Sequence, residues 1–93
     1  MPVTVRIPAP LRPVTGGAAA VECAPGTVRE LIDQLDAQHA GFRDRVMEDG
    51  SLRRFVNVFV AGEDVRFGDG IDTAVAEGQE VTILPAVAGG SAP

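Results

Sequence analysis

The sequence has 93 residues, of which 45% are hydrophobic, and a formal net charge of −5 at pH 7. This length allows one domain with one modest core, and no apolar run approaches the ~18 residues of a membrane span. The acidic balance disfavours nucleic-acid binding, which needs a basic surface. One Cys and one His exclude an internal disulfide and a zinc site with several ligands of these types.

The first six residues lack the basic head, apolar stretch and cleavage site of a secretory signal, so we expect a cytoplasmic protein that does not bind membranes. All eight basic residues are arginine, and a chain without lysine cannot form a lysine Schiff base. Cys23 and His39 have no catalytic partner at a recognisable spacing. We therefore expect no intrinsic catalytic residue and no metal site.

The N-terminal segment predicts an irregular hairpin. Residues 3–7 alternate apolar and polar side chains, which indicates a strand with Val3, Val5 and Ile7 facing the core. Three prolines interrupt the alternation, and Gly16-Gly17 follows as a turn. Residues 18–23 are expected to return as a second strand.

The next segment predicts the main helix. Thr27 and Glu30 have the spacing of a capping box, and the helix should stop near Gln38-His39, before Gly41. The apolar stripe that it should bury consists of Val28, Leu31, Ile32 and Leu35. Residues 42–47 are expected to add a short helical turn.

Residues 54–60 are rich in strand-forming side chains and predict a central strand. Because Asn57 does not suit a core, we expect Val56, Val58 and Val60 to face inward and Phe55 and Phe59 to face outward. Two exposed phenylalanines then need an explanation.

The C-terminal third predicts a short edge strand at residues 65–67, a weak helix at 72–76 and a last strand at 81–84 with Val81 and Ile83 inward. The resulting order of elements predicts an α+β fold of β-grasp (ubiquitin-like) type, with a mixed sheet of four to five strands and one main helix across one face. Residues 1–87 would form this domain, and residues 88–93 a flexible tail with little to bury.

The tail carries the strongest functional signal, Gly89-Gly90. Gly16-Gly17 shows that two glycines alone are unspecific, but after the last strand they can enter a narrow channel that a Cβ would obstruct. Residues 81–90 resemble the last strand and tail of the ThiS/MoaD family of ubiquitin-like sulfur carriers. Residues 3–8, 11–13, 15–17, 54–58 and 63–67 are similar to the actinobacterial members that serve cysteine biosynthesis.

The resemblance implies a role for each part of the tail and a set of partners. A ubiquitin-activating-type enzyme would adenylate the Gly90 carboxylate with ATP and convert it to a thiocarboxylate. In the cysteine branch, a pyridoxal-phosphate cysteine synthase would accept the sulfur, and a JAMM-type zinc peptidase would release cysteine. ATP, pyridoxal phosphate and zinc therefore belong to partner enzymes, and the carrier alone is expected to be a monomer.

Ser91-Ala92-Pro93 departs from a terminal diglycine, because it leaves the Gly90 carboxylate in a peptide bond. We expect cleavage between Gly90 and Ser91, with removal of all three residues; an expression remnant or an inactive relative is the alternative.

Partner enzymes are expected to dock on an apolar patch of Phe55, Phe59 and Leu84, unless these side chains pack under a loop. Alternative functions are sulfur donation to thiosugar, thiamin (thiazole) or molybdopterin synthesis, and protein modification.

Overall fold

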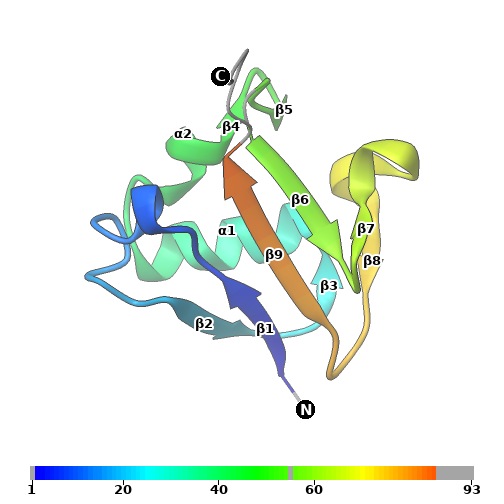
Figure 1. Cartoon of the computed structure of the whole chain (residues 1–93), viewed down its shortest axis with the longest axis horizontal. Coiled ribbons are helices and arrows are strands. Elements are labelled where there is room, and N and C mark those ends of the chain that lie inside the picture. The colour runs from blue at the N-terminus through cyan, green and yellow to red at the C-terminus, as the bar shows by residue number, and fades with distance from the viewer. Residues whose placement is uncertain (1, 55, 86–93) are drawn as a thin grey trace.

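The computed structural model describes residues 2–54 and 56–85. Its largest sheet has five strands in the order β2-β1-β9-β6-β7 (Figure 1). These are β1 (Val3–Arg6), β2 (Ala20–Cys23), β6 (Val56–Val60), β7 (Glu63–Asp64) and β9 (Glu80–Pro85). β1 and β9 are parallel, and the other neighbouring pairs are antiparallel. The sheet is therefore mixed, as the sequence predicted.

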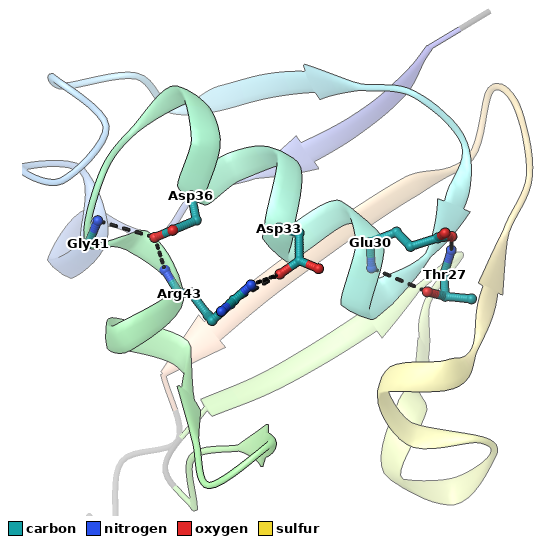
Figure 2. Close-up of polar contacts among 6 residues, drawn as sticks. All are labelled: Thr27, Glu30, Asp33, Asp36, Gly41 and Arg43. Atoms are coloured by element: carbon teal, nitrogen blue, oxygen red, sulfur yellow. Dashed lines mark hydrogen bonds and ion pairs between the residues drawn. The ribbon is translucent and has the colours of Figure 1, made fainter.

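Helix α1 (Val28–Gln38) crosses one face of this sheet (Figure 1). The predicted capping box is present: the Glu30 amide donates to Thr27 Oγ1 at 3.2 Å, and the Thr27 amide donates to Glu30 Oε1 at 2.8 Å (Figure 2). The buried side chains of the helix are the predicted stripe, Val28, Leu31, Ile32 and Leu35.

The alternating segments supply the other half of the core. Their inward side chains are at most 9% exposed, and all belong to one cluster with the α1 stripe. They are Val3, Val5, Ile7, Val56, Val58, Val60, Val81 and Ile83. Since successive side chains of a strand point to opposite faces, this core assigns the alternate residues to the face of the sheet away from α1.

Several short elements complete the described chain. The 3₁₀ helix η1 (Ala9–Leu11) lies between β1 and β2, and the expected helical turn forms as α2 (Phe42–Val46). After α2, β4 (Met47–Glu48) and β5 (Ser51–Leu52) pair as a tight hairpin.

The edge strand expected at residues 65–67 is wrong. This segment is the 3₁₀ helix η2 (Val65–Phe67), and the strand at the sheet edge is β7, two residues earlier. Asp64 explains the difference, because its side chain accepts a hydrogen bond from the Arg66 amide at 2.9 Å and thereby caps the turn. Val65, which is only 3% exposed, anchors the turn to the core.

The weak helix expected at residues 72–76 is also wrong. A 3₁₀ helix, η3 (Gly70–Asp72), precedes β8 (Ala74–Val75), and β8 pairs antiparallel with β3 (Gly26–Thr27). The Val28 amide extends this contact by donating to the Thr73 carbonyl at 3.0 Å. Pairing with a segment distant in the sequence therefore overrides the local helical preference.

Candidate functional site

The described chain ends at the root of the predicted tail. Pro85 is the last residue of β9, which lies between β1 and β6, and it pairs with Val56 at the start of β6. Ala88, Gly89, Gly90, Ser91 and Phe55 lie outside the described residues, as does the predicted domain limit at residue 87. The predicted tail thus begins just after a central strand of the sheet.

The open face, defined as the side of the five-stranded sheet away from α1, brings two predicted interface residues together. Thr82 of β9 pairs with Phe59 of β6, and Leu84 lies two residues farther along β9, so Phe59 and Leu84 are diagonal neighbours. Phe59 is half-buried, and the Leu84 residue is 44% exposed. They form an apolar patch close to the tail root.

Polar side chains surround this patch. Arg66 donates to the Asn57 side-chain oxygen and, through Nη2, to the Arg53 carbonyl at 2.8 Å. On the other side, Arg6 Nε lies 2.6 Å from Glu80 Oε2. An apolar centre with a polar rim has the anatomy of a protein-binding surface.

The structure also exposes an aromatic ring that the sequence analysis did not single out. Phe67 ends η2 and is 92% exposed, although its backbone is held in place by the Gly68 amide, which donates to the Val65 carbonyl at 3.0 Å. It lies beside a surface groove of about 600 Å³. The Gly68-Asp69-Gly70 sequence that follows is a turn signal that could have separated Phe67 from a strand.

Cys23 does not have the environment of a reactive thiol. It is 4% exposed at the end of β2, and its burial raises the pKa of the thiol above its usual value.

His39 ends α1, where its amide donates to the Leu35 carbonyl at 2.7 Å. Within residues 2–54 and 56–85, no three His, Cys, Asp or Glu side chains are grouped as metal ligands, and no helix is long and apolar enough to cross a membrane.

Comparison with known proteins identifies the family. The ThiS family model matches residues 5–90. The chain belongs to the ThiS family. The match confirms the family predicted from the tail and strands, and it ends on Gly90, three residues before the end of the sequence.

Members of this ThiS group resemble the chain over nearly its full length. Sulfur carrier protein CysO of Mycobacterium tuberculosis is 50% identical over 93 aligned residues, which cover 97% of this chain and 100% of CysO. A crystal structure of that CysO superposes with a TM-score of 0.86 at 49% identity, covering 91% of this chain and 99% of the other. The β-grasp fold is thus confirmed.

Two further relatives bear on partners and function. The Amycolatopsis orientalis BexX/CysO complex contains a chain that is 50% identical, with a TM-score of 0.90 and coverage of 95% of this chain and 99% of that chain. Small archaeal modifier protein 3 of Haloferax volcanii is 39% identical over 64 residues, covering 69% of this chain and 70% of the relative. The ThiS relatives are therefore named as carriers and modifiers, not as catalysts.

Proposed function

We propose that this protein carries sulfur as a thiocarboxylate on Gly90, after removal of Ser91-Ala92-Pro93, and that it serves cysteine biosynthesis. The observation that carries the proposal is the 50% identity to a sulfur carrier over that carrier's entire length. The end of the family match on Gly90 supports the choice of this residue as the working terminus.

The proposed chemistry needs activation because a carboxylate is a poor electrophile. A ubiquitin-activating-type enzyme would transfer adenylate from ATP to the Gly90 carboxylate and release pyrophosphate. Hydrosulfide would then attack the acyl carbon and displace AMP. The resulting thiocarboxylate is a nucleophilic sulfur in a form that partner proteins can recognise.

The carrier would contribute delivery rather than catalysis. Gly90 follows Pro85, the end of β9, by five residues, which span at most about 17 Å when extended. The terminus would therefore reach a buried active site while the domain stays on the partner's surface. We propose that Phe59 and Leu84 of the open face, with Phe55, make that surface contact.

Processing would control when the carrier becomes active. While Ser91 follows Gly90, the Gly90 carboxylate is an amide and cannot be adenylated. We propose that a peptidase, of the JAMM zinc type, cleaves this bond.

The proposed acceptor is the aminoacrylate that a pyridoxal-phosphate cysteine synthase forms. The thiocarboxylate sulfur would add to its β-carbon, and an acyl shift to the amine would leave cysteine in amide linkage to Gly90 for the peptidase to release. ATP, pyridoxal phosphate and zinc are all proposed for partners. The chain has no lysine for a pyridoxal-phosphate Schiff base. A thiosugar, thiazole or molybdopterin synthase is the alternative acceptor.

Reconstitution tests the proposal. A chain ending at Gly90 is incubated with ATP, sulfide and the host's ubiquitin-activating-type enzyme, and its intact mass should rise by about 16 Da as sulfur replaces oxygen. The matched control extends to Pro93 and should keep its mass until a host peptidase is added. Failure of the Gly90 chain to gain sulfur with an enzyme that consumes ATP in its presence would contradict the proposal.

Protein modification is the second candidate, favoured by the 39% identity to small archaeal modifier protein 3. A modifier would appear in host extracts as isopeptide conjugates between Gly90 and lysines of other proteins. A free thiocarboxylated monomer without such conjugates would decide for the carrier.

A further inference from the structure

Two of the eight arginines of this acidic chain differ from the other six in having no hydrogen-bond partner for the guanidinium group among the described residues. The guanidinium groups of Arg6, Arg12, Arg29, Arg43, Arg53 and Arg66 all have hydrogen-bond partners. Arg45 and Arg54 are exposed, and neither has an ion pair or side-chain hydrogen bond to any part of the chain that the structure describes. Among the described residues, Arg45 and Arg54 are thus the arginines with neither kind of partner, whereas Arg12 and Arg66 lack an ion pair but donate to neutral oxygens.

These two arginines line the same hollow. It measures about 400 Å³, and among the described residues Arg53, Glu48 and Val56 also line it. Arg53 is already bound, because its Nε donates to the Asp44 carbonyl at 2.8 Å and its Nη1 lies 3.5 Å from Glu48 Oε1. Three cations thus face one carboxylate in a protein with a net charge of −5.

The hollow adjoins the tail root, because Val56 pairs with Pro85. Its walls are fixed by contacts that do not involve the tail. The Asp36 carboxylate accepts hydrogen bonds from the Gly41 and Arg43 amides at 3.2 and 3.1 Å, and Arg43 is ion-paired with Asp33, which ties the start of α2 to α1 (Figure 2).

The segment with Arg53 and Arg54 forms the other wall of the hollow. It is bonded directly to α2, since the Arg53 amide donates to the Val46 carbonyl at 2.8 Å. Arg45 belongs to α2, and Arg54 follows Arg53 just before β6. The backbone positions of Arg45 and Arg54 are therefore set before any ligand arrives.

We propose that Arg45 and Arg54 bind carboxylate side chains at the mouth of the channel through which the activating enzyme receives the tail. This inference rests on the proposed function. Guanidinium groups match carboxylates in bidentate geometry. The phosphate groups of ATP are the other anionic ligand that the two arginines could bind. The nucleotide, however, reacts at Gly90, which an extended tail places about 17 Å beyond Pro85. That separation is well beyond an arginine side chain, so the occupant is a protein carboxylate.

Kinetics give the first test. In chains ending at Gly90, Arg45→Gln and Arg54→Gln should each raise the KM for thiocarboxylation about fivefold, leave kcat unchanged and weaken its salt dependence. The matched control is Arg29→Gln, an exposed arginine on α1 whose Nη2 lies 3.3 Å from Asp72 Oδ1, and its KM should stay at the wild-type value.

Crosslinking gives the second test, because the chain contains no lysine. With the activating enzyme and a water-soluble carbodiimide, R45K and R54K should form amide crosslinks from the substituted positions to enzyme carboxylates, whereas R29K should not. Unchanged KM values for both Gln variants, or crosslinks no stronger than those of R29K, would overturn the inference. The proposed function would still stand if the wild-type chain is thiocarboxylated. Failure of the wild-type chain to be thiocarboxylated would overturn both.

Discussion

Substitution of Phe59 tests the role of the open face, and the register decides which substitution is informative. Phe59 lies directly opposite Asp64 on β7 and Thr82 on β9. An Asp at position 59 would put like charges opposite each other and weaken the sheet edge itself. Phe59→Thr avoids this charge, keeps a strand-forming side chain and places Thr opposite Thr82.

The expected magnitudes separate binding from folding. Loss of a half-buried cross-strand aromatic pair costs up to about 1 kcal/mol of folding free energy, which lowers Tm by about 5 °C in a domain of this size. Loss of an aromatic anchor at an interface costs about 2 kcal/mol, or roughly a 30-fold weaker Kd. At 25 °C the variant should therefore remain folded and bind poorly.

Isothermal titration of the activating enzyme with chains ending at Gly90 measures this difference, with thermal unfolding by circular dichroism in parallel. Phe67→Thr is the matched control, because the Phe67 residue is 92% exposed and lies outside the sheet; its Kd and Tm should both stay near wild type. A Phe59→Thr chain that is folded and binds with wild-type Kd would refute docking through the open face.

Three further predictions concern the stability of the folded domain and the reactivity of its cysteine. Thr27→Ala removes the acceptor for the Glu30 amide and should cost about 1 kcal/mol in urea unfolding; an unchanged midpoint would contradict the importance of the capping box. Val58→Ala leaves a cavity at a site that is 1% exposed and should cost about 2 kcal/mol, whereas a cost below that of Thr27→Ala would place Val58 outside the tight core. Because burial raises the pKa of Cys23, iodoacetamide at pH 8 should alkylate the folded protein at least about tenfold more slowly than the urea-unfolded chain, and equal rates would contradict this.

The sequence predicted those elements whose own periodicity matches their burial. Val3, Val5 and Ile7 alternate because one face of β1 is buried, and the stripe from Val28 to Leu35 repeats with the helical period for the same reason. In both cases local pattern and tertiary packing agree, so the pattern alone predicts the correct buried face.

The two wrong elements depend on contacts that no local pattern contains. Ala74 and Ala76 favour helix as isolated residues, but Ala74 and Val75 form β8 against Gly26 and Thr27. Val65 and Phe67 are strand formers, yet the Asp64 cap and the burial of Val65 make residues 65–67 a 3₁₀ turn.

The candidate site divides in the same way. The diglycine was singled out from its position in the chain. Strand alternation predicted the outward face for Phe59, whereas the register that makes Phe59 and Leu84 diagonal neighbours is known only from the structure. Arg45 and Arg54 were missed because they are nine positions apart in the sequence and come to one hollow only through the contact of the segment before β6 with α2.

The conversion of Gly90 to a sulfur-bearing terminus is the step on which the proposed function depends. Its most direct test is the intact mass of the protein isolated without reductive or acidic treatment from sulfur-replete cells of its own host. We predict a species that ends at Gly90 and is about 16 Da heavier than the free carboxylate. A population that retains Ser91-Ala92-Pro93, with no sulfur-bearing form under conditions of active cysteine synthesis, would contradict the proposed role of Gly90.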